Sequence, residues 1–352
     1  MRRRVVVALA ALVVVVVVAV ALVAVPRWRD SQRTDLERAA SYAPSDAQRL
    51  SWTDWDGVRR EVGARIDASS SGDQLQDFLD EAYDADLSSA SALVQSAPVL
   101  QSHFGFSPAS VESELFSQSD KGAVVLLTMP DDTDFAAIGD QLEESGFTRP
   151  SDDGGVWKGG DTLLPSIGSD LTPELQYVAL DADAHLVLTS DTADYLQQTV
   201  DALGDDALPD GMQATLSASG DPLSASVYDG EVACSALAMG QADAADQEEG
   251  DRLVAEAGEV NPVTGLAMSV QPDGHVRVVL SFENDDQART NADSRAVLAA
   301  GPAPGQGGDF ADRFSVGSVT ADGSLVRMDL KPREGTYVFS DLSSGPVLFA
   351  TC

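Results

Sequence analysis

Basic residues are scarce in this sequence of 352 residues, which has 22 Lys and Arg against 57 Asp and Glu. Lysine occurs only at Lys121, Lys158 and Lys331, and the formal net charge is -35 at pH 7. A surface this acidic repels phosphate backbones. We therefore expect no nucleic-acid partner, and we interpret the acidity as a means of solubility rather than as a cation-binding device.

Histidine is also scarce, and the local motifs of catalysis and metal binding are missing. His103, His185 and His275 show no H-E-x-x-H spacing, no G-x-S-x-G turn is present, and no Lys precedes Ser or Thr as a phosphate-binding loop requires. We expect structural or surface roles for these histidines. The sequence therefore predicts no catalytic residue, no metal site and no cofactor.

Carboxylate pairs are frequent, but their settings indicate turns and helix caps. They occur at Asp131-Asp132 with Asp134, at Asp181 with Asp183, and at Asp205-Asp206. The Gly and terminal Glu of a calcium loop follow none of them. Aromatic residues make up only 6% of the chain, and we assign Trp55 to the core and Trp52 to a contact beside a helix start, rather than to an aromatic binding face.

Only two cysteines are present, Cys234 and the final residue Cys352. In a translocated chain the simplest interpretation is one disulfide, which would close a loop of more than a hundred residues and hold the C-terminus to its domain. The alternative is a pair of buried thiols in a reducing compartment. We expect the Cys234–Cys352 disulfide, because a terminal residue is seldom well buried.

Long apolar runs are absent except for residues 5–25, which contain only Val, Ala and Leu and follow Arg2–Arg4. This run is long enough to cross a bilayer and longer than the apolar part of a cleavable signal. The alternative is cleavage near Ala19–Ala21. We expect residues 1–4 in the cytoplasm, an anchor at 5–25, a juxtamembrane stalk at 26–51, and a single-pass cell-membrane protein with its bulk extracytoplasmic.

The next part, residues 52–208, is predicted to be a first α+β domain. It begins with helices only, the first of them capped by Thr53, and turns to a buried strand at 123–129. A helix, a hairpin over 175–189 and a helix capped by Asp191 follow.

Residues 209–352 are predicted to be a second α+β domain, closed by the disulfide. A strand at 224–228 precedes helices over 231–257, a hairpin over 265–282 and a helix opened by Asn284. A further hairpin around Ala321–Gly323 and an apolar tail complete it.

These patterns suggest an internal repeat between residues 120–205 and 222–300. His185 and His275 are expected at equivalent strand starts, and the helix after each hairpin is expected to cover an equivalent sheet face. The expected fold class is α+β, with two α/β-sandwich-like units of strand, helix, hairpin and helix, preceded by a helical segment and a transmembrane helix.

Three stretches resemble a group of uncharacterised, membrane-anchored extracytoplasmic proteins of high-GC Gram-positive bacteria. They are Trp52–Val58, Asp285–Ala292 and Gly345–Cys352, together with the Arg-started apolar run. The resemblance implies a location in the cell envelope and no particular chemistry.

The absence of catalytic motifs favours a binding or envelope-associated structural module over an enzyme. Its partner is expected to be the membrane, through residues 5–25, and an envelope protein or a small ligand. The alternative is a secreted or anchored hydrolase whose active site is assembled from distant residues.

Overall fold

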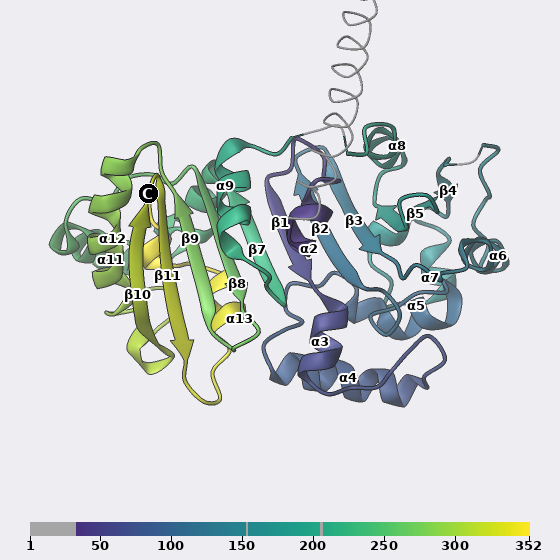
Figure 1. Ribbon diagram of the computed structural model, residues 1–352, viewed down its shortest axis with the longest axis horizontal. Helices are drawn as coiled ribbons and strands as arrows, with labels where there is room; N and C mark the ends of the chain where they lie inside the picture. Colours follow the sequence, from purple (N-terminus) through teal and green to yellow (C-terminus); the bar gives the residue numbers. More distant parts are fainter. Residues whose placement is uncertain (1–32, 153, 205–206) are drawn as a thin grey trace, which may run out of the picture.

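The computed structural model describes residues 33–152, 154–204 and 207–352, in which one antiparallel sheet of 11 strands runs the length of the molecule (Figure 1). The strand order is β10-β11-β9-β8-β7-β1-β2-β3-β6-β5-β4. The strands are β1 (Arg49–Thr53), β2 (Ser113–Ser119), β3 (Gly122–Thr128), β4 (Trp157–Lys158), β5 (Tyr177–Asp181), β6 (Leu186–Ser190), β7 (Ser224–Asp229), β8 (Gly265–Val270), β9 (Val276–Ser281), β10 (Phe314–Asp322) and β11 (Leu325–Pro332).

Helices pack on both faces of the sheet. The α-helices are α2 (Asp35–Ala40), α3 (Trp55–Glu61), α4 (Gly72–Asp84), α5 (Ala97–His103), α6 (Phe135–Glu144), α7 (Leu164–Ile167), α8 (Ala193–Asp201), α9 (Asp210–Ser219), α10 (Gly230–Val232), α11 (Ala244–Ala257), α12 (Asp285–Ala299) and α13 (Val338–Ser343). Short 3-10 or π turns are η1 (Val94–Ser96), η2 (Pro173–Leu175), η3 (Ala233–Leu237), η4 (Met239–Gln241), η5 (Phe310–Asp312) and η6 (Leu348–Ala350).

Two apolar cores follow from this arrangement, one on each face. On the face that we call the α9 face, the core contains Leu36 of α2, Leu196 of α8 and Met212 of α9. On the opposite α4 face, a larger core contains residues of α3 to α6 and of α12 and α13, among them Phe78 and Phe339. Successive side chains of a strand point to opposite faces, so each buried strand contributes to both cores.

The local expectations from the sequence are largely confirmed. The strand β3, the hairpins β5–β6, β8–β9 and β10–β11, and the helices α4, α6 and α12 lie where the hydrophobic periods placed them. Asn284 caps α12 by accepting a hydrogen bond from the Gln287 N–H at 3.0 Å.

The predicted fold class, with two separate sandwich-like units, is wrong. β1 pairs with β7 over five residues, from Arg49↔Tyr228 to Thr53↔Ser224, and this pairing joins the strands of both halves in one continuous sheet. An unpaired β1 or β7 would expose a row of backbone N–H and C=O groups, which the pairing satisfies. The domain boundaries at 52–208 and 209–352 stay predictions.

The predicted register of the internal repeat is also wrong. The helix after the β5–β6 hairpin, α8, packs on the α9 face, whereas α12 after the β8–β9 hairpin packs on the α4 face. The strand order does repeat when the strands are matched differently. Counted outward from the β1–β7 junction, the first half begins with the order β1-β2-β3-β6-β5 and the second half has the order β7-β8-β9-β11-β10. A hairpin followed by a helix occurs twice in each half. The sequence pattern therefore matched the second such unit of the first half, β5–β6–α8, with the first such unit of the second half, β8–β9–α12.

The segment expected to contain only helices also contains strands. Residues 49–53, assigned partly to a stalk and partly to a helix start, form β1 at the centre of the sheet, and Ser113–Ser119, expected to continue a helix, form β2. Conversely, the turn-rich stretch 204–222 contains the helix α9. Pairing and burial override the weak local preferences of these short segments.

The predicted location also needs correction. None of the helices that the structure describes is long and apolar enough to span a bilayer. The longest of them, α12, has 15 residues and two acids in its first turn, while a membrane helix needs about 20 apolar residues. The predicted location, a single-pass cell-membrane protein with most of its chain extracytoplasmic, is therefore not supported. The expected anchor at residues 5–25 lies outside the described residues.

Candidate functional site

The strand β1 places three polar side chains on the α4 face at the centre of the sheet. Leu50 and Trp52 are buried in the core of the α9 face. Because side chains alternate along a strand, Arg49, Ser51 and Thr53 point the other way. These residues therefore lie at the middle of the α4 face of the sheet.

The neighbouring strand β7 adds more polar residues at the same positions. Ser226 lies opposite Ser51, and Ser224 lies opposite Thr53, in the antiparallel register of the two strands. We call the set Arg49, Ser51, Thr53, Ser224 and Ser226 the central polar row. It lies where the two half-sheets meet.

Two polar atoms of the central polar row, Arg49 Nε and Thr53 Oγ1, are buried without a hydrogen-bond partner in the described chain. A buried polar group without a partner costs about 1–3 kcal/mol, and most such groups in proteins are satisfied. Similar unpartnered atoms occur elsewhere in the described chain, at Ser117, His185 and Thr189, but those on β1 include a charged side chain, Arg49.

A surface cavity of about 470 Å³ opens at the Arg49 end of the central polar row. Strands β1, β2 and β7, the loop after α4, η3 and α13 form its walls. We call it the Arg49 cavity. Its lining residues are Gln48, Arg49, Ser89, Gln118, Ser119, Tyr228, Val232, Ala236, Leu237, Ser340, Ser343 and Ser344.

The side chains of Arg49 and Tyr228 form one wall of the cavity. The guanidinium carbon of Arg49 lies 5.3 Å from the centroid of the Tyr228 ring, a cation–π distance. The Tyr228 hydroxyl donates to the Ser343 carbonyl oxygen at 3.0 Å, which fixes the ring against α13. Burial raises the pKa of Tyr228, while the charge of Arg49 and the nearby Ser226 hydroxyl oppose that rise.

The wall formed by α13 is held from a distant part of the chain. The carboxylate of Asp86, in the loop after α4, accepts hydrogen bonds from the N–H groups of Phe339 at 2.7 Å and Ser340 at 3.1 Å. Asp86 has φ 60°, a left-handed conformation that Asp tolerates better than most residues. Burial raises the pKa of Asp86 to about 6, although both N–H bonds act to lower it.

At the other end of the row, Glu114 of β2 is a buried carboxylate opposite Thr53. Its oxygens accept from Trp55 Nε1 at 3.0 Å, Ser91 Oγ at 2.7 Å and the Ala92 N–H at 2.6 Å. Loss of solvation raises the pKa of Glu114 in spite of these bonds. With all its contacts inside the protein, Glu114 holds the loop after α4 against the sheet.

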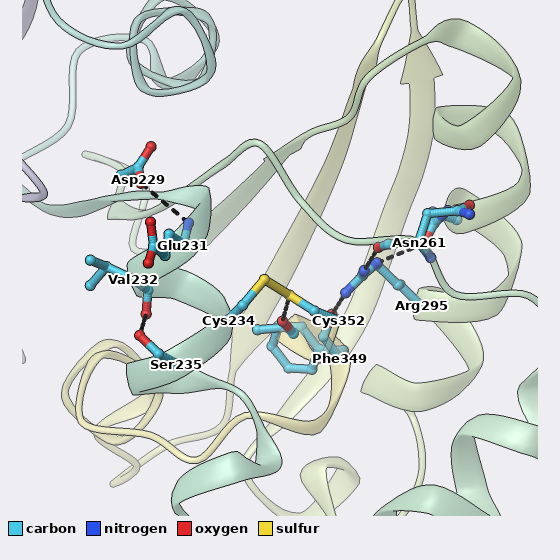
Figure 2. Close-up of a disulfide and its surroundings, with 11 residues drawn as sticks. Asp229, Glu231, Val232, Cys234, Ser235, Asn261, Arg295, Phe349 and Cys352 are labelled. Atoms are coloured by element: carbon cyan, nitrogen blue, oxygen red, sulfur yellow. Dashed lines mark hydrogen bonds between the residues drawn. A yellow bond between two sulfur atoms is a disulfide. The ribbon is translucent and has the colours of Figure 1, made fainter.

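The predicted disulfide between Cys234 and Cys352 is confirmed, and it ties η3 to the end of the chain (Figure 2). Beside it, the buried Arg295 of α12 donates to the carbonyl oxygens of Phe349 and Asn261, both at 2.6 Å (Figure 2). A loop of 118 residues closed by a disulfide is worth about 4–5 kcal/mol in the chain-entropy model. The C-terminal segment is therefore held at two points, by the disulfide and by Arg295.

The three histidines lie apart from the Arg49 cavity. His103 is the last residue of α5, and His185 has φ 53° in the β5–β6 turn, with its ring 6.3 Å from that of Phe135. His275 Nδ1 lies 2.9 Å from a carboxylate oxygen of Asp273 in the β8–β9 turn. Within the described residues, no group of three or more His, Cys, Asp or Glu side chains is arranged to hold a metal ion.

Two members of the carboxylate pairs, Asp134 and Asp181, make local hydrogen bonds. Asp134 caps α6 by accepting from the Ala137 N–H at 3.0 Å, and Asp181 accepts from the Ala184 N–H at 2.9 Å. Asp205 and Asp206 lie outside the described residues. Trp52 and Trp55 are both buried, Trp52 on the α9 face and Trp55 on the α4 face, so neither forms an exposed binding rim.

The sequence alone does not reveal the Arg49 cavity. The alternation Arg49-Leu50-Ser51-Trp52-Thr53 was the available signal, since a strand with one apolar and one polar face follows this pattern. Ser224–Tyr228 is predicted to be a strand, but the sequence does not show which strand lies beside its polar face. Only the β1–β7 register brings the two polar faces together.

Comparisons with known proteins give no family. No protein-family model and no curated protein matches the chain. Two solved structures, crystal forms I and III of TP0453, each align with this chain at a TM-score of 0.39 and 9% sequence identity. The alignment with form I covers 90% of this chain and 99% of that chain, and the alignment with form III covers 86% of this chain and 97% of that chain. A TM-score this low supports no conclusion about function.

Proposed function

We propose that this protein is a binding module that holds a small polar molecule in the Arg49 cavity. The observation that carries the proposal is Arg49, which lines the cavity and whose Nε is buried without a partner in the described chain. A stable fold has no need of such groups at the centre of its sheet, whereas a binding site benefits from unused donors and acceptors.

The cavity is better suited to binding than to catalysis. Serine hydroxyls line it, but neither a histidine nor a carboxylate is among the described residues of its wall. A serine nucleophile needs a base within hydrogen-bond reach. The alternative of a hydrolase therefore has no support at this cavity, and we propose that the protein is not an enzyme.

A blocking substitution tests the proposal on the full-length protein. Ser344 lines the cavity and is exposed, so Ser344→Trp places a large side chain at the cavity without altering the core. The matched control is Ser169→Trp at an exposed loop position. Native mass spectrometry against a panel of polar metabolites should give bound species with the wild type and Ser169→Trp, and none with Ser344→Trp.

Two results of this experiment contradict the proposal. One is that no compound of the panel adds mass to the wild-type protein. The other is that Ser344→Trp binds the same compounds as Ser169→Trp, with equal melting temperatures showing that both variants are folded.

A further inference from the structure

The Arg49 cavity differs in charge from the rest of this acidic molecule. Arg49 is the sole charged residue among the described residues that line it. Four other cavities of the described chain are each lined by at least one Asp. In a chain with 57 Asp and Glu, the cavity therefore combines one cation with the absence of a lining carboxylate.

Arg49 has no partner for its charge in the part of the chain that the structure describes. None of the ion pairs or side-chain hydrogen bonds there includes its guanidinium, and its Nε is buried without an acceptor. Other arginines, such as Arg277 with Asp329 and Arg252 with Glu249, pair with nearby acids. A planar guanidinium that lies over an aromatic ring keeps its N–H edge available for an oxyanion.

Neutral groups around Arg49 supply further donors and acceptors. The side chains of Gln48, Gln118, Ser89 and Ser340 line the cavity, and within the described residues none of them has a hydrogen-bond partner. Amides and hydroxyls of this kind both donate and accept, as sugar and polyol hydroxyls do. The volume of about 470 Å³ is within the usual range for small-molecule sites.

From these observations we infer that the Arg49 cavity takes a small polyhydroxylated molecule with one oxyanion group, a carboxylate or a phosphate, which Arg49 binds. The inference rests on the proposed binding function and adds the chemical class of the ligand. The acidic surface repels anions at long range, so the contact with Arg49 decides the affinity once the ligand is inside.

Isothermal titration calorimetry of the full-length protein at about 0.15 M salt tests this, since long-range charge effects are then screened beyond about 8 Å. The probes are gluconate, glucose 6-phosphate, inorganic phosphate and uncharged glucose. Gluconate or glucose 6-phosphate should bind at least tenfold more tightly than glucose. Comparing the two separates carboxylate from phosphate recognition, and inorganic phosphate shows how much the oxyanion contributes alone.

The variants separate a role in binding from a role in folding. Arg49→Gln should weaken the anionic probe at least tenfold, and Arg49→Lys should restore part of the affinity by returning the charge without the planar fork. The control, Arg289→Gln, removes the same charge from an exposed position on α12 and should change nothing. Unchanged melting temperatures exclude misfolding as the cause.

The outcomes distinguish this inference from the proposed function. If glucose binds as well as gluconate and glucose 6-phosphate, and Ser344→Trp blocks all three, the cavity is a binding site and the inferred anion is wrong. Anion binding that Arg49→Gln leaves intact also overturns the inference. If neither these probes nor the wider panel binds, the proposed function fails as well.

Discussion

Arg49 and Arg295 are two arginines with opposite surroundings. Arg295 is fully buried, and each of its three side-chain nitrogens donates one hydrogen bond. The acceptors are Asn291 Oδ1 at 3.0 Å and the carbonyl oxygens of Phe349 and Asn261 at 2.6 Å. It lacks a carboxylate, so burial lowers its pKa to about 9. Arg49 has no such acceptors in the described chain. We therefore assign Arg295 to stability and Arg49 to binding.

Substituting each arginine with Met should show this difference. Arg295→Met leaves buried oxygens without donors and should lower the free energy of unfolding by about 2–4 kcal/mol. Arg49→Met removes a buried donor that has no partner and also removes one cation–π contact. These two effects oppose each other, so we expect the free energy of unfolding to change by no more than about 1 kcal/mol. Urea denaturation measures both values. An equal loss in the two variants would contradict the assignment of Arg49 to binding.

Asp86 should make stability depend on pH. Its pKa is raised from 3.8 to about 6 by burial, so its contribution is fully present below about pH 3.8 and is lost as the pH rises through 6. At about 1.36 kcal/mol per pKa unit, the loss is at most about 3 kcal/mol. Asp86→Asn keeps an acceptor for α13 and tolerates the left-handed backbone, so it should flatten this pH dependence.

Denaturant melts between pH 4 and pH 7 check the expectation for Asp86. Asp77→Asn, at an exposed position of α4, is the control and should follow the wild-type curve. A curve for Asp86→Asn parallel to that of the wild type would show that Asp86 does not titrate in this range.

At the scale of elements, α9 depends on a close backbone contact with the sheet. A Cβ added to Gly211 of α9 would collide with the backbone at Thr264 and Gly265, where β8 begins. The collision is with backbone atoms, which cannot rotate away as a side chain does. The absence of side chains at Gly211 and Gly265 therefore sets how closely α9 approaches the sheet.

Gly211→Ala should therefore destabilise the protein, even though Ala favours a helix more than Gly does. Overpacking against backbone costs about 1–3 kcal/mol, so the helix preference of Ala offsets only part of it. Gly240→Ala is the control, because a Cβ there meets nothing within 4 Å. Thermal unfolding of both variants makes the comparison. A Gly211→Ala protein as stable as the wild type would mean that α9 can shift freely.

At the scale of the whole molecule, the net charge of -35 acts against folding. Like charges are closer together in the folded state, and salt screens their repulsion. Increasing the salt from about 0.02 M to about 0.5 M at pH 7.5 should raise the melting temperature by several degrees. Near the sequence pI of about 4.1 the same change should have little effect. A salt effect of equal size at both pH values would contradict this account.

Most of the individual elements were predictable from the sequence. The turns at Asp273-Gly274 and Asp322-Gly323 indicated their hairpins, and the apolar run at residues 123–129 indicated β3. The two cysteines were enough to predict the disulfide, since each had a single possible intramolecular partner. These features depend on neighbours in the chain or on a simple count of residue types.

The tertiary structure alone decided how the elements combine. β1 is short and polar on one face, and α9 lies in a stretch rich in turn residues, so both depend on distant contacts for their stability. The Arg49 cavity likewise exists because Arg49, Tyr228 and Ser340 come from three distant segments. Strand pairing is a long-range interaction, and no local period in the sequence encodes which edges meet.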